Sequence, residues 1–274
     1  MIYDFSNRKI NIDSSHRCPL ECHKCQRQAI RKAGYKVPGK DMPWNDFLKI
    51  ANYFEKGLIF CGQISDPTAN PLLIDMLKYC YKKNIPVSIN TAASHKSVEW
   101  YEEAFDVNPN GVWMFGIDGL PKDSHKYRIH QDGEKLFEMV KLCAKKCKTS
   151  VWQYIVFRYN ENDIEEARDM ALANNIDFDL VFSGRWVSGD KFKPRNPNYY
   201  VDRHNVDLKK IKDEGYKDWK KEMDKLTTND FDENWKKGLD KMASEQLPRK
   251  PNERFFTNTH NPVKTILSTR RYKK

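Results

Sequence analysis

The strongest constraint on the fold is a regular alternation of short apolar runs and longer amphipathic segments along the first two thirds of the chain. Segments of strand length, either apolar or alternating between apolar and polar residues, occur at 8–15, 58–62, 85–91, 111–119, 151–157 and 176–184. Segments with the three- and four-residue apolar spacing of a helix occur at 44–57, 71–84, 96–105, 134–147 and 162–175. This alternation predicts parallel βαβ units with right-handed crossovers, and therefore an α/β fold.

Two architectures accommodate six strands with a helix after each of the first five. A partial (β/α)₆ barrel, similar to a TIM barrel, takes the strands in chain order and needs no division into two sets, so we favour it. A doubly wound sheet is the alternative. The chain has 274 residues, which is long enough to bury a large core without help from disulfide bonds.

The alternation ends after Trp186, which predicts a core domain at 1–186 and a polar, basic C-terminal extension at 187–274. We expect the extension to be partly helical, at 206–226 and 234–247, and either to cover the barrel opening or to contact substrate. It carries 22 Lys and Arg residues against 14 Asp and Glu, whereas the core carries 26 against 24. A basic surface can bind phosphate, but a solvated lysine-rich tail has the same composition, and both interpretations stay open.

The cysteine content indicates the compartment. The chain has seven cysteines, an odd number, and its first residues contain no apolar signal core. These features are not typical of a secreted protein with a disulfide framework. No apolar run is long enough to span a bilayer. We therefore expect a cytoplasmic protein with no membrane partner.

Distinctive polar residues follow every predicted strand. In barrels of parallel strands, the catalytic groups collect in the loops after the carboxyl ends of the strands. In chain order, these residues are Cys18, Cys22 and Cys25; Gly62, Gln63, Ser65 and Asp66; Asn90 and Thr91; Asp118; Arg158; and the run 183–186. Because they all fall at the same end of the strands, the sequence predicts one active site there, and it includes the three cysteines.

Cys18, Cys22 and Cys25 have the spacing C-x₃-C-x₂-C, and closely spaced thiolates bind soft metals. A structural zinc site needs four protein ligands, and His16 or His23 could supply the fourth. An iron–sulfur cluster normally takes four thiolates, so three would leave one iron open to a small ligand. The alternatives are therefore an enzyme with an open iron site and a non-catalytic, zinc-stabilised nucleic-acid-binding protein.

The triplet and its place after the first strand resemble the radical SAM superfamily, and the resemblance extends to about residue 184. In that family three cysteines hold a [4Fe–4S] cluster, and the fourth iron binds the amino and carboxylate groups of S-adenosylmethionine (SAM). The segment "CGQISDP" (61–67) resembles the family's glycine-rich segment after strand two. The segment "SINTAAS" (88–94) resembles one that ends Thr-Asn-Gly, and "FGIDGLPKDSHKYR" (115–128) resembles the ribose-side strand, which is followed by a His and an Arg.

The resemblance implies that the three cysteines bind the cluster and that several residues contact SAM. The implied SAM contacts are Gly62, Gln63, Ser65, Asp66, Asn90, Thr91, Asp118 and Arg158. Among these, Asp118 would face the ribose, and Arg158 would face the SAM carboxylate or an anionic substrate. This chain departs from the family pattern at Lys24, where an aromatic residue is common, at Asp66, where glutamate is usual, and at Gly116, which replaces a serine.

The resemblance also implies a reaction and partners. The reduced cluster would cleave SAM to a 5′-deoxyadenosyl radical, which abstracts hydrogen from an unidentified substrate. A reductase, a flavodoxin or a ferredoxin would supply the electron. The basic C-terminal third favours RNA or a nucleotide as substrate. A peptide is the second choice, because no change of composition before Cys18 indicates a leader-binding domain.

Overall fold

The computed structural model describes residue 6 and residues 8–54 and 56–201. The chain divides into two compact units, Met1–Val201 and Asp202–Lys274. The first unit is described below, and the helices expected at 206–226 and 234–247 lie outside the described residues. The proposed boundary between core and extension at residue 186 stays a prediction.

Six parallel strands form one sheet, as the sequence predicted. The strands are β1 (Ile10–Ile12), β2 (Leu58–Cys61), β3 (Val87–Thr91), β4 (Val112–Gly116), β5 (Thr149–Ile155) and β6 (Asp177–Val181). Their spatial order is β1-β2-β3-β4-β5-β6, and each neighbouring pair is parallel. A doubly wound sheet would reverse its order at a switch point. The order observed is that of an unclosed barrel, so the partial (β/α)₆ barrel is confirmed.

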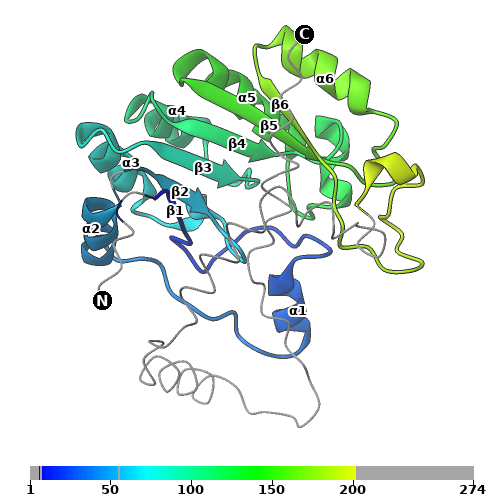
Figure 1. Ribbon diagram of the computed structural model, residues 1–274, viewed down its shortest axis with the longest axis horizontal. Coiled ribbons are helices and arrows are strands. Elements are labelled where there is room, and N and C mark those ends of the chain that lie inside the picture. The colour runs from blue at the N-terminus through cyan, green and yellow to red at the C-terminus, as the bar shows by residue number, and fades with distance from the viewer. Residues whose placement is uncertain (1–5, 7, 55, 202–274) are drawn as a thin grey trace, which may run out of the picture. The chain divides into compact units, whose positions relative to one another are not determined.

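Five helices follow the first five strands and lie on one side of the sheet (Figure 1). They are α2 (Trp44–Tyr53), α3 (Leu73–Lys82), α4 (Val98–Asp106), α5 (Gly133–Lys146) and α6 (Ile164–Ala173). Side-chain caps fix two of their starts, because Ser97 accepts a hydrogen bond from the backbone of α4 and Asp132 from that of α5. A further helix, α1 (Gln26–Lys32), was not predicted and stands apart from the other five.

The core lies between the sheet and these five helices. Strand residues alternate, so that Trp113 and Phe115 of β4 are buried against the helices while Met114 faces the other way. Gln153 of β5 shares the face of Met114, since its Nε2 lies 3.0 Å from the Met114 Sδ. We call this the inner face. Its residues are Asn11, Asp13, Ile59, Cys61, Ser88, Asn90, Val112, Met114, Gly116, Thr149, Val151, Gln153, Ile155, Asp177, Asp179 and Val181.

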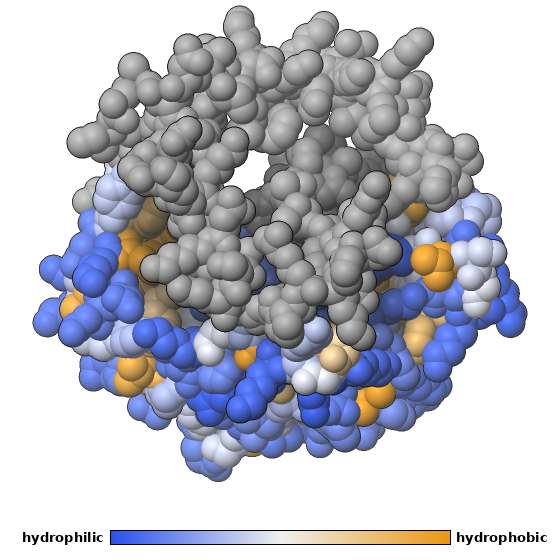
Figure 2. Space-filling model, turned by 90° about the horizontal axis from the view of Figure 1, so that it is seen from below, coloured by the Kyte–Doolittle hydropathy of each residue, from blue (hydrophilic) through white to orange (hydrophobic). Residues whose placement is uncertain are grey.

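The surface of the described part is mostly hydrophilic on the side shown in Figure 2, with apolar residues scattered over it. None of the described helices has the length and apolar content that a membrane crossing requires.

Candidate active site

The loop after β1 carries the cysteine triplet and is held at both ends. The backbone N–H of Cys25 donates to the carbonyl of Cys22 at 3.0 Å, and α1 begins directly after Cys25. On the other side, the N–H groups of Glu21 and His23 donate to carbonyls of the segment 127–129 at 3.1 and 3.3 Å. The loop therefore lies against the chain that follows β4.

The environment of the three thiols fits an iron–sulfur cluster. The pKa of Cys18 is raised to about 12, mainly by burial and also by the charges of Asp66, Cys22 and Cys25, while a hydrogen bond from the Leu20 N–H opposes the shift. The three thiols thus lie within electrostatic range of one another in a partly buried loop. Each thiolate of a cluster binds a different iron, so the three need not meet at one point. Within the described part of the chain, no three His, Cys, Asp or Glu side chains are gathered around a single-ion site.

The other described cysteines lie elsewhere. Cys80 and Cys143 are fully buried in the core between sheet and helices. Cys147 directly follows α5, with its Sγ 4.0 Å from the carbonyl oxygen of Phe105. None of these three lies in a loop at the carboxyl ends of the strands. Cys61 ends β2 on the inner face, opposite Asn90 of β3.

The glycine-rich segment after β2 has a fixed backbone. A Cβ on Gly62 would lie 2.1 Å from the carbonyl oxygen of Ser65, so only glycine fits there. Asp13, the residue after β1, accepts hydrogen bonds from the N–H of Gln63 at 3.0 Å and from the hydroxyl of Ser65. Sequence reasoning missed Asp13, although a carboxylate at the end of the first strand was a visible signal.

Asp66 ties the end of β2 to the end of β3. Its buried carboxylate accepts hydrogen bonds from the N–H and hydroxyl of Thr68, from the hydroxyl of Thr91 at 2.9 Å and from the N–H of Ala92 at 3.0 Å. The side chains of Asp66 and Thr91 are therefore engaged with each other. Asn90 lies one residue before this tie, on the inner face. Direct contacts of these residues with SAM remain predictions.

A buried ion pair lies at the end of β4. Asp118 is fully buried, its Oδ1 accepts from the N–H of Ile155 at 3.0 Å, and its Oδ2 lies 2.7 Å from the Nε of Arg128. Burial raises the pKa of Asp118, and Arg128 opposes that shift. A Cβ on Gly116 would lie 2.7 Å from the Nη2 of Arg128, so the absence of a side chain at 116 makes room for the guanidinium. Both charges act electrostatically on Cys22.

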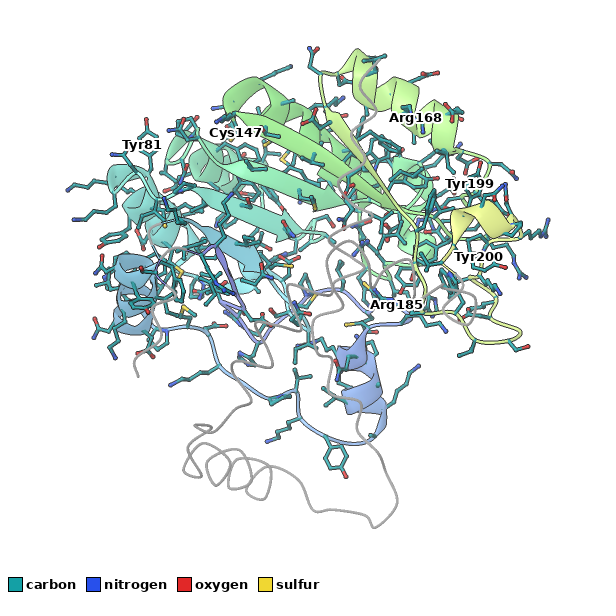
Figure 3. The ribbon with its side chains drawn as sticks, viewed as in Figure 1. Tyr81, Cys147, Arg168, Arg185, Tyr199 and Tyr200 are labelled. Atoms are coloured by element: carbon teal, nitrogen blue, oxygen red, sulfur yellow. The ribbon has the colours of Figure 1, made fainter. Side chains whose placement is uncertain are left out.

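Arg128 is thus more central than the sequence suggested, and Arg158 less so. The backbone N–H of Arg158 donates to the carbonyl of Phe192 at 3.0 Å, and its Nε donates to that of Lys193 at 2.9 Å. Arg158 therefore holds the segment after β6 in place, and its contact with SAM remains a prediction. Arg185, labelled in Figure 3, follows β6 and lies within electrostatic range of Asp118.

An aromatic cluster packs against the cysteine loop. Tyr127, Phe157 and Phe192 form its buried centre, and Cys22 packs against it. The rings of Tyr127 and Phe157 stack with centroids 4.1 Å apart, and His23 lies 4.8 Å from Phe192.

An ion pair adds a second contact between the cysteine loop and the segment after β6. Lys24 of the loop pairs with Asp190, whose side chain is 3% exposed. The segment 186–193 therefore covers one side of the cysteine loop through both a charge pair and apolar packing.

The comparison with protein families decides between the alternatives that the sequence left open. A family model described as "Radical SAM superfamily" matches residues 12–171, which is more than half of the chain. The chain belongs to the radical SAM superfamily. This family comprises iron–sulfur enzymes that use SAM, so the predicted [4Fe–4S] cluster and SAM are confirmed as cofactors, and the zinc-stabilised binding protein loses its support.

Similar proteins share the core and extend beyond it. A protein of Pyrococcus furiosus, "Tungsten-containing aldehyde ferredoxin oxidoreductase cofactor-modifying protein", is 28% identical over 114 residues, which is 40% of this chain and 30% of that protein. Streptococcus suis SuiB bound to SAM is 17% identical with a TM-score of 0.54, over 69% of this chain and 44% of SuiB. The anSMEcpe structure with AdoMet and the Cp18Cys peptide is 14% identical with a TM-score of 0.52, over 68% and 54%. This chain therefore spans less than half the length of the first two proteins, and the structural likeness supports the fold.

Proposed function

We propose that this chain is an enzyme that uses SAM to abstract a hydrogen atom from its substrate. The observation that carries the proposal is the convergence of the cysteine loop with the Asp118–Arg128 pair at the carboxyl ends of the strands. When bound, the cluster and SAM supply a one-electron reductive cleavage that yields a 5′-deoxyadenosyl radical. The residues of the chain position the cofactors and the substrate around that chemistry.

Cys18, Cys22 and Cys25 would hold the cluster and leave its fourth iron for SAM. The backbone of residues 62–65, which Asp13 fixes, would bind the SAM amino group. Arg128 is the strongest candidate for the SAM carboxylate. A guanidinium carries five N–H donors, and the Asp118 carboxylate lies against its Nε side. Asp118 would then orient Arg128 in addition to any contact with the ribose.

The inner face bears on the class of substrate. Its strand positions carry no Lys or Arg, and β6 contributes Asp177 and Asp179 to it. The guanidinium of Arg128, which reaches this face at Gly116, is paired with Asp118. Asp179 accepts a hydrogen bond from Gln153 at 3.2 Å, and it has no ion-pair partner among the described residues. A phosphate group placed here would meet carboxylates, whereas a neutral or cationic group would be stabilised. This favours a peptide over a nucleotide or RNA, which reverses the order that the sequence favoured.

Two structures of similar fold are consistent with this order. SuiB has been solved with its precursor peptide SuiA, and anSMEcpe with the Cp18Cys peptide. A peptide substrate for this chain remains part of our proposal.

The test is anaerobic reconstitution with iron and sulfide, followed by addition of dithionite and SAM and detection of 5′-deoxyadenosine by chromatography. We expect the wild-type protein to form this product and the Cys22→Ala variant to form none. Cys147→Ala is the matched control, because Cys147 lies at the end of α5, and it should behave as the wild type. A protein that carries zinc without sulfide, or an intact cluster that never cleaves SAM, would contradict the proposal.

A further inference from the structure

The segment that follows Cys22 concentrates positive charge beside the cluster loop. Between Cys22 and Asp41 the chain has no Asp or Glu, whereas residues 1–186 as a whole are nearly balanced. The cations are Lys24, Arg27, Arg31, Lys32, Lys36 and Lys40. We call residues 23–40 the basic segment. Its charge is a local feature, because the rest of the first unit does not share it.

Three of these six cations make ion pairs or hydrogen bonds within the chain, and the other three face solvent. Lys24 and Arg31 form ion pairs with Asp190 and Glu21, and Arg27 donates to two backbone carbonyls. The remaining three are exposed and have no ion-pair partner in the part of the chain that the structure describes. They are Lys32, Lys36 and Lys40. These three ammonium groups contribute nothing visible to the fold of the described chain, so they are available to a partner.

Helix α1 presents this charge without packing into the core. It has seven residues, none of them buried, and it stands apart from helices α2–α6 (Figure 1). Packing on an apolar face stabilises most helices in proteins, and α1 lacks such a face. The helix ends with two basic residues, Arg31 and Lys32, and the chain then turns at Gly34, which has a φ of 81°. An exposed, basic element of this kind is suited to a transient contact.

Lys32, the first of these free cations, is close to the cysteine loop along the chain. α1 begins at Gln26, directly after Cys25, so Lys32 is about two helical turns from a cysteine that would bind the cluster. His23, beside Cys22, lies within electrostatic range of both Lys32 and Lys191. Electron transfer weakens steeply with distance, so a protein that reduces the cluster must dock close to these cysteines. The basic segment is an exposed surface that meets this requirement.

We propose that the basic segment, together with Lys191, is the docking surface for a small acidic electron-carrier protein. This inference rests on the proposed function, because the carrier would supply the electron that the proposed cleavage of SAM consumes. One electron leaves the reduced carrier and enters the cluster, and no bond forms between the two proteins. Complementary charge speeds such encounters and makes them sensitive to salt, and the interfaces of electron carriers are small and transient. The free cations are all lysines, which lack the bidentate fork that favours RNA phosphates and bases.

The test compares two triple charge reversals. Lys32→Glu/Lys36→Glu/Lys40→Glu changes the docking surface, and Lys78→Glu/Lys82→Glu/Lys83→Glu makes the same change of net charge on exposed positions in and after α3. Binding of an acidic flavodoxin and of an acidic ferredoxin to the reconstituted protein is measured by calorimetry at low and at physiological salt. The rate of 5′-deoxyadenosine formation is measured with each reduced carrier and, separately, with dithionite.

We expect the first variant to weaken carrier binding by about tenfold or more and to slow carrier-driven turnover, with dithionite-driven turnover unchanged. The α3 variant should retain both activities and the wild-type salt dependence. Equal carrier binding by the two variants would overturn the proposal. So would loss of binding to a poly(U) RNA in the first variant with carrier binding intact. If dithionite fails to drive the wild type, the proposed function fails, and the binding comparison still decides the docking surface.

Discussion

The tie between Asp66 and the end of β3 gives a prediction whose size can be worked from the structure. Asp66→Ala removes a buried carboxylate that accepts from two backbone N–H groups and two hydroxyls. A hydrogen bond to a charged group contributes about 1.5–3 kcal/mol, and a buried donor left unpaired costs about 1–3 kcal/mol. These contributions overlap within one network, and water can enter the space left by the carboxylate. We therefore expect a loss of about 3–5 kcal/mol in the free energy of unfolding.

The assay is urea unfolding of the apoprotein in reducing buffer, followed by far-ultraviolet circular dichroism. Thr91→Val removes a single donor and should cost about 1–2 kcal/mol. The double variant Asp66→Ala/Thr91→Val should lose little more free energy of unfolding than Asp66→Ala alone, because the two side chains share one interaction. Asp75→Ala, at an exposed position in the first turn of α3, is the control and should cost less than about 1 kcal/mol. An Asp66→Ala variant within about 1 kcal/mol of the wild type would refute the structural role of this carboxylate.

Three further predictions concern the rest of the site. Gly116→Ala places a Cβ against the Arg128 guanidinium and should weaken SAM binding about tenfold, while the iron content stays unchanged. An unchanged affinity for SAM in calorimetry would contradict the proposed role of Arg128. Asp190→Asn breaks the ion pair with Lys24 and should shorten the lifetime of the cluster in air, which is measured by the decay of its visible absorbance. Asp123→Asn, which breaks the more exposed ion pair with Lys126, should leave that lifetime unchanged. Burial raises the pKa of Asp179, so the folded state holds its proton to higher pH and stability falls as pH rises from about 4 through the folded pKa. Asp179→Asn should reduce this fall in urea unfolding measured at increasing pH from about 4, and an unchanged pH profile would count against it.

The sequence predicted the sheet and its helices because both periodicities are strong in this chain. The sequence did not predict the elements whose structure does not depend on burial of apolar residues. Helix α1 has no buried residue, so its sequence carries no apolar spacing to detect. The first strand was expected at 8–15 and spans only Ile10–Ile12, because the chain then leaves the sheet and Asp13 turns to bind the loop at 62–65. Hydrophobic patterning cannot show a residue that acts on a distant loop.

The sequence placed the polar clusters correctly at one end of the strands, since the carboxyl ends of parallel strands share an edge. It could not choose between the two arginines near that edge. The backbone N–H of Arg158 donates a hydrogen bond to the carbonyl of Phe192, a residue of the segment after β6. Arg128 reaches Asp118 only because Gly116 leaves space for its guanidinium. Both facts depend on contacts between segments whose approach no local pattern encodes.

The departures from the family pattern make sense when each is considered with its partner in the fold. Lys24 replaces an aromatic residue and pairs with Asp190, whose neighbour Phe192 brings a ring to the same loop. Gly116 replaces a serine and makes room for Arg128. Asp66 replaces a glutamate, and its shorter carboxylate is held by Thr91.

In each of these three cases the residue that departs from the family pattern lies against a residue elsewhere in the chain, namely Asp190, Arg128 or Thr91. The single variants Asp190→Asn and Gly116→Ala should be costly for this reason, because each one disrupts half of a matched pair.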